Sequence, residues 1–366
     1  MNVGGPAVIV ADLMRGLDPA RYNQELITGF CDENEADYLE TVATDITVTR
    51  IAGLGRSISP LADFRAFVSL IIKIKKEKPD VIHTHTAKAG VLGRLAAMLA
   101  GSKALRVHTF HGHLLHGYFA GWKIKLVVAI EKYLAKHTDY LLAVGNQVRL
   151  DLLAVGIGKE SQYRTFFPGL PKPPTFDKSA ERAKLDLSPE KIYCTFVGRL
   201  TQIKRPDRLL DIASLTAKSH SNLHFLIAGE GELFNSSKAR AVAENLPFTF
   251  LGWRSDIAQL FAASDIAILT SDNEGIPLTL IQAAQAGLAI VAPKVGSIAD
   301  IVLDGKTGAL TRPDSAEMAI SLGKLVDSAA LRRQYGDAGK IHADQSFSLA
   351  KSLNDHGLLY DFSQLK

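Results

Sequence analysis

A polar turn followed by a helix-like run lies in the last third of the chain, and its residue types suit ligand binding. Ser271–Glu274 ends an apolar, strand-like segment, and Gly275–Leu278 leads into the helix-like run. Backbone N–H groups at a helix N-terminus attract anions, and the Glu274 carboxylate accepts hydrogen bonds from ligand hydroxyls. Gln282 follows Glu274 by eight residues, a little over two helical turns, so we expect it to face the same ligand. An acidic loop that merely caps a helix is the competing interpretation.

Two basic residues follow another strand-like segment, and together they could bind a diphosphate. Arg199 offers a bidentate fork and Lys204 a compact point charge. Lys204 stands just before Arg205-Pro206-Asp207, which is typical of a helix start, where the helix dipole adds to the attraction for an anion. Ordinary surface charge is the competing interpretation.

Histidines are concentrated in the first half of the chain. Six of the eleven lie between residues 83 and 116, namely His83, His85, His108, His111, His113 and His116. Imidazole is a common metal ligand, but no Asp, Glu or Cys occurs between Lys88 and His116 to complete a mixed site. We therefore expect no metal site, and instead one or two ligand-facing histidines with the others structural.

Short β-branched runs alternate with longer amphipathic segments, as in parallel sheets crossed by helices. The expected strands are residues 25–29, 81–83, 105–109, 140–144, 193–197, 224–228, 249–251, 266–270 and 289–292, and residues 61–77 and 209–218 are typical of helices. A proline-rich stretch at 168–174 interrupts this pattern and is the best linker. We therefore expect an α/β protein of two doubly wound halves facing a central cleft, with ligands beyond the carboxyl ends of the strands.

Composition fits an intracellular globular protein. The 366 residues suffice for two domains, and 47% hydrophobic with 22% charged residues is ordinary for a soluble chain. Cys31 and Cys194 are the two cysteines, which predicts no disulfide framework and a reducing compartment. No apolar run approaches the roughly 18 residues of a membrane helix, and no signal peptide opens the chain. We expect a cytoplasmic or peripheral protein.

The net charge of +4 is unevenly distributed. Residues 60–137 contain thirteen Lys and Arg against four Asp and Glu. Nucleic acid, anionic lipid and a phosphorylated substrate all suit such a stretch, and so do solvated lysines on helix faces. Within it, Tyr118–Val128 mixes aromatics, lysines and aliphatics. This segment could lie on an anionic membrane surface, and a helix packed in the first domain with its lysines outward is the slightly favoured alternative.

Taken together, these segments resemble the retaining GT-B glycosyltransferases of family 4, also called group 1. The closer likeness is to bacterial members that act on lipid-linked or cell-surface glycan precursors. The resemblance covers nearly the whole chain, and its motifs are specific in their order and spacing. In order, they are Gly4-Gly5, His83–Gly90, Val107–Gly112, Gly198–Leu200 with Lys204, Leu251-Gly252, and Glu274–Pro277 followed by Ala283 and Gly287.

The resemblance implies a role for each matching residue. Arg199 and Lys204 hold the diphosphate as leaving group, the work that a metal does in other transferases. Glu274 binds a donor-sugar hydroxyl, amides from Gly275 to Leu278 fix the sugar, and His111 lies beside the reacting carbon. The binding residues implied are Gly4, Gly5, His85, Gly252, Trp253, Arg254, Gly275, Ile276, Pro277, Leu278 and Gln282. No metal and no cofactor is implied.

The implied activity is transfer of a sugar from a nucleotide sugar, with UDP-sugar the first choice. The acceptor would be a glycan or a polyprenyl-diphosphate-linked precursor, the configuration would be retained, and no metal would take part. Such an enzyme serves polysaccharide and cell-envelope synthesis at the inner face of the cell membrane, with no nucleic-acid partner. An epimerase or hydrolase of the same fold, and a nucleotide-sugar-binding protein without turnover, remain open.

The resemblance also implies a domain plan, from which the chain departs twice. Residues 1–170 would bind the acceptor, 171–345 would bind the nucleotide sugar, and 346–366 would pack back on the first domain. Gln282 stands where the family usually has a second glutamate that binds the ribose, a loss of about 1 kcal/mol of charge-assisted bonding. Only Met1-Asn2-Val3 precede Gly4, where the family has a β-strand. We therefore expect that the sequence starts late or is truncated, and that lengthening it upstream raises the melting temperature.

Overall fold

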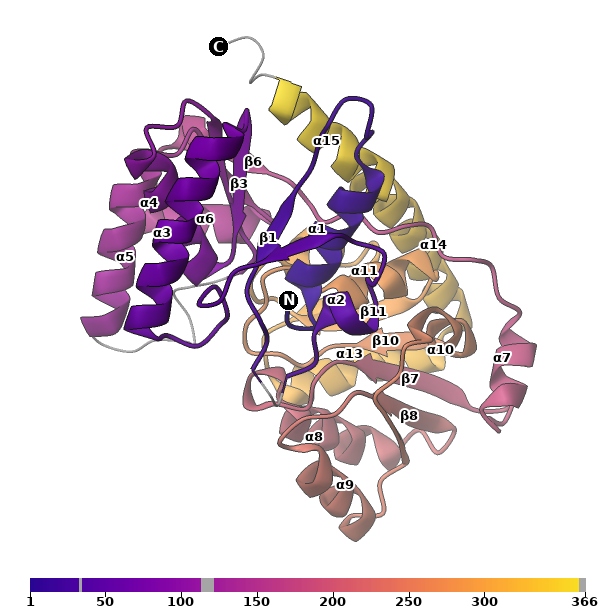
Figure 1. Ribbon diagram of the computed structural model, residues 1–366. Coiled ribbons are helices and arrows are strands. Elements are labelled where there is room, and N and C mark those ends of the chain that lie inside the picture. Colours follow the sequence, from indigo (N-terminus) through magenta and orange to yellow (C-terminus); the bar gives the residue numbers. More distant parts are fainter. Residues whose placement is uncertain (33–34, 113–121, 362–366) are drawn as a thin grey trace. The chain divides into compact units, whose positions relative to one another are not determined.

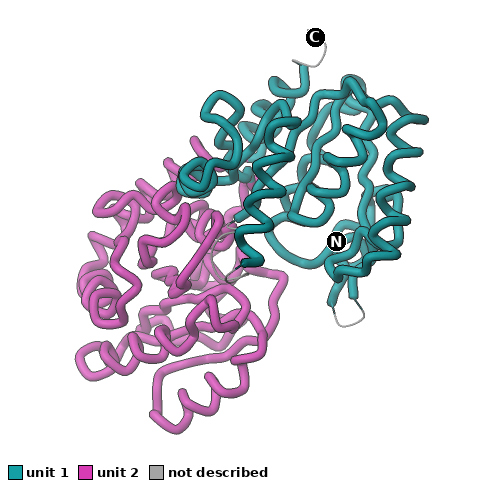
Figure 2. The backbone as a smooth tube through the Cα atoms, turned by 90° about the vertical axis from the view of Figure 1, so that its left-hand side faces the viewer, with its two compact units in different colours: residues 1–169, 349–366 teal, residues 170–348 magenta. Residues whose placement is uncertain are grey.

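Parallel strands and helices alternate along the described chain (Figure 1). The computed structural model describes residues 1–32, 35–112 and 122–361. The chain divides into two compact units: Met1–Gly169 with Leu349–Lys366, and Leu170–Ser348 (Figure 2). The sheets of each unit are parallel, with helices between consecutive strands, which confirms the α/β class with two Rossmann-like parts. The assignment of acceptor to the first unit and nucleotide sugar to the second stays a prediction.

The first unit contains two separate parallel sheets. One has the order β3-β4-β5-β6, with the strands Val81–His85, Leu105–Phe110, Tyr140–Ala143 and Tyr163–Thr165. The other pairs β1 (Leu26–Thr28) with β2 (Val48–Arg50). Before the first helix, Asn2 forms an isolated antiparallel bridge with Asp37. Because β3 and β4 pair in register from Val81 and Leu105 onward, their carboxyl ends meet at one edge, where His85 and Phe110 end the strands.

Helices connect these strands because a parallel pair needs a long crossover. In the first unit they are α1 (Gly5–Gly16), α2 (Tyr38–Thr41), α3 (Pro60–Glu77), α4 (Ala87–Leu99), α5 (Trp122–Ala135), α6 (Asn146–Ala154), the 3₁₀ turn η1 (Glu160–Gln162) and α15 (Leu349–Asp361). Small residues let α4 lie close to α3, where Ala96 and Ala97 pack against Leu70 and Ile74. Within the described ranges, every helix is too short or too polar to cross a bilayer.

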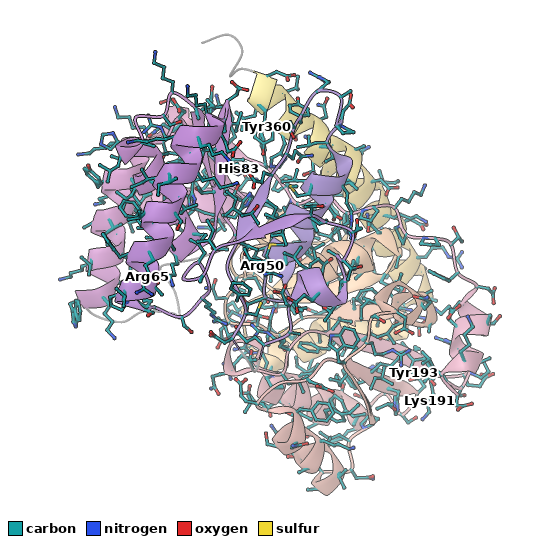
Figure 3. The ribbon with its side chains drawn as sticks, viewed as in Figure 1. Arg50, Arg65, His83, Lys191, Tyr193 and Tyr360 are labelled. Atoms are coloured by element: carbon teal, nitrogen blue, oxygen red, sulfur yellow. The ribbon has the colours of Figure 1, made fainter. Side chains whose placement is uncertain are left out.

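The last helix, α15, belongs to the first unit although its residues end the described chain. Leu359 is buried with Leu105, Val107 and Leu142 of the sheet. The hydroxyl of Tyr360 lies 2.5 Å from Nδ1 of His83, and Figure 3 shows the two side chains together. The core of the first unit is therefore completed by residues that follow the whole second unit in sequence.

The second unit has one six-stranded parallel sheet in the order β12-β11-β10-β7-β8-β9. The strands are β7 (Ile192–Val197), β8 (Leu223–Ala228), β9 (Phe248–Gly252), β10 (Ile266–Ile268), β11 (Ala289–Pro293) and β12 (Gly308–Thr311). The chain runs outward from β7 to one edge and then outward from β10 to the other. The reversal between β7 and β10 is the topological switch point at which open α/β sheets bind ligands.

Helices complete the second unit. They are α7 (Lys178–Lys184), the 3₁₀ turn η2 (Gln202–Lys204), α8 (Pro206–Ala217), α9 (Phe234–Ala243), α10 (Ile257–Ala263), α11 (Leu278–Gln285), α12 (Ile298–Ile301), α13 (Ser315–Asp327) and α14 (Ala329–Ser346). Every residue of β10 and β11 is buried, as expected for strands in the interior of a parallel sheet. The sheet is thus a rigid base for the loops that follow β7 and β10.

Candidate active site

The loops after β7 and β10 meet at the switch point and bring Lys204 to Glu274. Nζ of Lys204 donates to Oε1 of Glu274 at 2.5 Å, although the residues are 70 positions apart. The hydroxyl of Ser271 donates to the same oxygen at 2.6 Å. Only 22% of the Lys204 side chain and 10% of the Glu274 side chain are exposed. Two of the predicted site residues therefore form one half-buried ion pair.

Hydrogen bonds to backbone carbonyl groups hold the two loops together. The hydroxyl of Thr270 donates to the carbonyl of Lys204 at 2.8 Å, and the N–H of Asp272 donates to the carbonyl of Ile203 at 2.9 Å. On the other side, Gly296 has φ of +50°, and a Cβ there would lie 1.7 Å from the Glu274 carbonyl oxygen. Only glycine fits this close approach. The position of Glu274 is therefore fixed from both sides.

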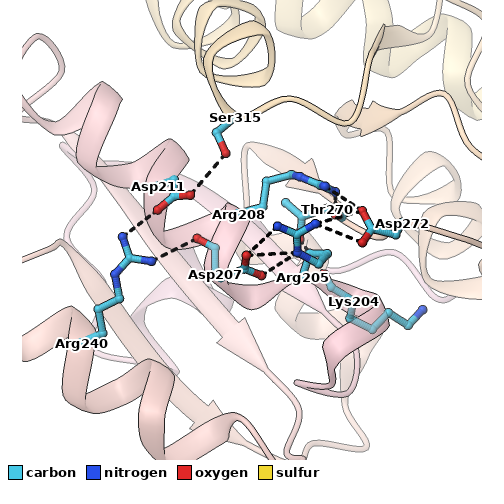
Figure 4. Close-up of polar contacts among 9 residues, drawn as sticks. All are labelled: Lys204, Arg205, Asp207, Arg208, Asp211, Arg240, Thr270, Asp272 and Ser315. Atoms are coloured by element: carbon cyan, nitrogen blue, oxygen red, sulfur yellow. Dashed lines mark hydrogen bonds and ion pairs between the residues drawn. The ribbon is translucent and has the colours of Figure 1, made fainter.

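An ion-pair network behind Lys204 reinforces this arrangement (Figure 4). Arg205 pairs with Asp207 at 2.7 Å and with Asp272 at 3.0 Å. Arg208 donates to the carbonyl of Thr270 at 2.5 Å and to Asp272 at 2.6 Å. The network joins the start of α8 to the loop after β10, so it keeps the Lys204 backbone against the Glu274 loop. Sequence reasoning took Arg205-Pro206-Asp207 only as a helix start and missed Arg208, Asp272 and Gly296.

Arg199 does not join the pair. Its side chain is exposed and makes no ion pair with the described residues. Its backbone is fixed, because a Cβ at Gly229 would lie 2.0 Å from the Gly198 carbonyl oxygen, and Leu200 donates its N–H to the carbonyl of Glu230 at 2.9 Å. The loop after β8 thus packs directly on the Arg199 loop, while the guanidinium stays available to a ligand.

The loop after β9 places the residues predicted to receive the base. Gly252 has φ of +67°, and the N–H of Trp253 donates to Oε1 of Glu230 at 3.4 Å. The Trp253 side chain is 62% exposed, which leaves an aromatic face open for stacking. Arg254 instead pairs with Asp256, its Nε donating to Oδ1 at 2.8 Å, so its guanidinium is already partly engaged.

Helix α11 begins directly after the Glu274 loop, with Pro277 at its N-cap. No side chain caps it in the described part of the chain. The N–H of Leu280 donates to the carbonyl of Pro277 at 3.0 Å, so the N–H groups before Leu280 are the ones a ligand can use. Pro277 itself has no N–H, and of the predicted amides only those of Gly275, Ile276 and Leu278 can donate. Gln282 lies one turn further along α11 and is half-buried.

In the first unit, the predicted residues His85 and His111 are brought together. Nδ1 of His85 and Nε2 of His111 share a hydrogen bond of 2.9 Å. Burial, and to a lesser extent nearby His356, lower the pKa of His111 to about 4, so its ring is neutral near pH 7. Gly4 is the N-cap of α1, which begins at Gly5.

The other histidines are mainly structural. His108 is buried, and its Nδ1 shares a hydrogen bond of 2.9 Å with the Thr84 hydroxyl. Across the described ranges, no group of three or more His, Cys, Asp or Glu is arranged to hold a metal ion. His113, His116 and the Tyr118–Gly121 part of the segment considered for membrane contact lie outside the described residues.

Comparison with known proteins places this chain in a family. The model for glycosyl transferases group 1 matches residues 177–342, and the model for the glycosyl transferase 4-like domain matches residues 4–165. A galactosyltransferase of Escherichia coli, named as acting on UDP-Gal and α-D-GlcNAc-diphosphoundecaprenol, is 31% identical over an alignment of 281 residues that covers 71% of this chain and 68% of the relative. The capsular polysaccharide glycosyltransferase CapM of Staphylococcus aureus is 22% identical over 86% of this chain and 84% of its own.

Solved structures agree on the fold. HepE of Anabaena, crystallised with UDP and glucose, superposes with a TM-score of 0.82 at 19% identity, covering 98% of this chain and 96% of its own. Sucrose-phosphate synthase of Thermosynechococcus elongatus gives 0.81 at 21% identity, covering 98% and 93%. With both family models matched in chain order and a relative above 30% identity, the chain belongs to the group 1 glycosyltransferases and is a glycosyltransferase of the GT-B fold.

Proposed function

We propose that this glycosyltransferase moves a sugar from a UDP-sugar to a lipid-linked or glycan acceptor, with retention of configuration and without a metal ion. The observation that carries the proposal is the Lys204–Glu274 pair at the switch point of the second unit. A cation and a hydroxyl-binding carboxylate in contact, next to an uncapped helix N-terminus, match the two ends of a sugar diphosphate. The names of the Escherichia coli and Anabaena proteins support UDP as the nucleotide and a polyprenyl diphosphate as acceptor carrier.

The pair divides the work between leaving group and sugar. Lys204, with Arg199, balances the negative charge that grows on the departing diphosphate, and the first-turn amides of α11 add to it. Glu274 accepts a hydrogen bond from a sugar hydroxyl, and Ser271 holds its carboxylate in place. The Trp253 face stacks on the base, beside Gly252, and the Gln282 amide bonds the ribose. Because Lys204 already lies on Glu274, donor binding only redirects a positioned ammonium.

Retention follows if the acceptor attacks from the side of the leaving group through an oxocarbenium-like state. The diphosphate then takes up the acceptor proton while Arg199 and Lys204 hold it in place. In the first unit, His111 with His85 would lie beside the reacting carbon, and Gly4-Gly5 would allow close backbone approach. Fixed cations supply the charge stabilisation that a metal gives elsewhere, which is the physical basis for expecting metal independence.

A product assay tests this proposal. The purified chain is incubated with a panel of UDP-sugars, with and without a polyprenyl-diphosphate-linked glycan, in buffer with and without EDTA. We expect glycosylated acceptor with the donor's anomeric configuration by NMR, and no loss of rate in EDTA. A sugar altered without acceptor indicates an epimerase, release of free sugar alone indicates a hydrolase, and binding without product indicates a non-catalytic protein. Any of these outcomes, or inversion, contradicts the proposal.

The proposal includes peripheral contact with the inner face of an anionic membrane, through helix α5. Along one side of α5 run Trp122, Leu126, Ile130 and Tyr133, with exposed fractions of 69%, 52%, 36% and 51%. Lys123, Lys125, Lys132 and Lys136 are exposed around this stripe. The one acidic residue of the helix, Glu131, is buried in an ion pair with Arg94. An apolar stripe among unopposed lysines suits anionic lipid, and the same charge disfavours pairing with a second copy.

Vesicle co-sedimentation tests the membrane contact. Lys123→Glu with Lys125→Glu should weaken binding to phosphatidylglycerol vesicles about tenfold or more, since each lysine near the surface contributes about 1 kcal/mol. Lys218→Glu with Lys238→Glu, exposed lysines of the second unit, is the matched control and should bind as the unchanged chain does. Equal loss in both double variants, or no binding by the unchanged chain, contradicts this use of α5.

A further inference from the structure

Four imidazole rings form a continuous series of contacts in the first unit. The ring centroids are 5.9 Å apart from His356 to His83, 4.1 Å from His83 to His85, and 5.1 Å from His85 to His111, with interplanar angles of 29° to 34°. His356 comes from α15, His83 and His85 from β3, and His111 from the turn after β4. Only His85 and His111 have a part in the proposed function. Because consecutive rings are such close neighbours, the orientation of each ring restricts that of the next.

His83 is locked at both ring nitrogens. Nδ1 lies 2.5 Å from the Tyr360 hydroxyl, and Nε2 lies 2.7 Å from the Thr109 hydroxyl. A neutral imidazole has one donor and one acceptor nitrogen, and a hydroxyl can serve either, so both bonds are satisfied at once. Turning the His83 ring would break both. Its neighbour His85, at 4.1 Å, therefore packs on a ring that cannot rotate freely.

Helix α15 presents the fixing groups on one face. Ser352, His356 and Tyr360 follow one another at intervals of four residues, the spacing of neighbours on a helix surface. Nδ1 of His356 donates to the carbonyl of Ser352 at 2.8 Å, so its proton is on that nitrogen. The helix is anchored independently, because the hydroxyl of Tyr22 lies 3.2 Å from the Gly357 carbonyl and 2.8 Å from the Asp361 carboxylate.

The other end of the series is open. His85 and His111 share one hydrogen bond, while Nδ1 of His111 is buried and has no partner among the described residues. An unpaired buried ring nitrogen is costly unless a ligand uses it. Burial and mutual proximity lower the pKa values of His83 and His85 well below the usual range, so the rings lie near one another without like-charge repulsion near pH 7.

We propose that Tyr360 and His356 of the C-terminal helix are positioning residues for glycosyl transfer: they orient His83 and His85, and through them fix the ring of His111 with Nδ1 toward the substrate. This inference rests on the proposed role of His111 beside the sugar. It makes α15, which follows all three sheets in sequence, a support of the proposed active site.

The variant Tyr360→Phe tests whether Tyr360 orients the histidine rings, because it removes the hydroxyl that contacts His83 and keeps the aromatic ring. Tyr22→Phe removes a hydroxyl contact to the same helix without touching an imidazole, and is the matched control. Imidazole ¹⁵N spectra of the full chain without substrate report which ring nitrogen carries each proton. We expect changed His83, His85 and His111 signals in Tyr360→Phe and unchanged signals in Tyr22→Phe. Unchanged His85 and His111 signals in Tyr360→Phe overturn the proposal, whatever the enzyme's activity.

Steady-state kinetics test the consequence for transfer. We expect Tyr360→Phe to lower kcat about tenfold with KM for the donor changed less than about twofold, since a misplaced reacting group affects the transition state more than ground-state binding. Tyr22→Phe should have the same kcat as the enzyme without a substitution. A normal kcat in Tyr360→Phe, despite altered spectra, overturns the role in transfer. If the unchanged chain transfers no sugar, the proposed function fails, and the spectra still decide whether the rings are coupled.

Discussion

At the scale of residues, the structure brings Lys204 and Glu274 into contact by two routes. Their side chains form a half-buried ion pair, and their backbones are tied by Thr270, Asp272 and Gly296. Removing one partner leaves the other charge in a partly desolvated place, which costs more than losing an exposed surface pair. A ligand phosphate can take the place of the carboxylate beside the ammonium. The Lys204–Glu274 ion pair is therefore stable without a ligand, and the Lys204 ammonium can exchange the carboxylate for a ligand phosphate.

Lys204→Ala should lower turnover by about 10² to 10³, the usual effect of removing one fixed donor to a developing charge. The fold should persist, because the backbone ties to Lys204 remain. Steady-state transfer rates and circular dichroism measure the two effects, with Lys238→Ala as a control at an exposed lysine. Full activity of Lys204→Ala would remove this residue from the mechanism. Loss of activity together with loss of fold would leave Arg199→Ala as the decisive variant.

At the scale of elements, the joint between η2 and α8 is held in an unusual backbone conformation. Arg205 has φ of +52°, in the left-handed region that a residue with a Cβ rarely adopts. Its ion pairs with Asp207 and Asp272 help to hold it there, and the side-chain hydrogen bonds to these carboxylates raise the pKa of its guanidinium above the usual range. The turn points Lys204 toward Glu274 while α8 continues from Pro206.

Arg205→Gly should be more stable than Arg205→Ala by about 1 kcal/mol, because both lose the ion pairs and only glycine adopts this φ without strain. Urea unfolding gives the difference in free energy of unfolding. Arg333, exposed in the interior of α14, provides the opposite case: there the glycine variant should be the less stable by about 1 kcal/mol. If the glycine variant were less stable than the alanine variant at both positions, Arg205 would not be held in the left-handed region in solution.

At the scale of the whole molecule, buried histidines should make the free energy of unfolding depend on pH. Burial lowers the pKa of His111 and of His224 to about 4, and the pKa values of His83, His85, His108 and His356 are also lowered. Unfolded histidines take up protons near pH 6.5, before the folded ones do. The contribution that these uncharged, buried imidazoles make to the free energy of unfolding is therefore complete above pH 6.5. It is lost as the pH falls toward about 4.

The free energy of unfolding should thus decrease from pH 7 to pH 5, and His85→Gln should reduce that decrease by about 1 kcal/mol. Urea titrations at pH 7 and pH 5 give the free energy of unfolding at each pH. The change between the two pH values tests the prediction, and the absolute stability of the variant does not. His137→Gln, at an exposed position, should keep the decrease of the unchanged chain. An identical decrease in His85→Gln would mean that His85 is protonated alike in the folded and unfolded states.

Much of the fold was predictable from hydrophobic pattern. The expected strands at 105–109, 193–197 and 289–292 are β4, β7 and β11, because buried parallel strands appear as continuous apolar runs. The strands β2, β6 and β12 were missed. They are short, and Val48–Arg50 and Tyr163–Thr165 mix polar residues with single hydrophobic ones, so only pairing with a neighbouring strand makes them strands.

The sequence by itself determined the α/β class, the family motifs, and the residue types at the ends of β7 and β10. The tertiary structure decided which of those residues touch. Lys204 and Glu274 meet because their strands are neighbours in the sheet, whereas exposed Arg199 takes no part in that ion pair. The Arg208–Asp272 contact and the contacts of His83 with His356 and Tyr360 of α15 had no local signal. Contacts between segments distant in sequence depend on strand order and helix packing, which no short stretch of sequence encodes.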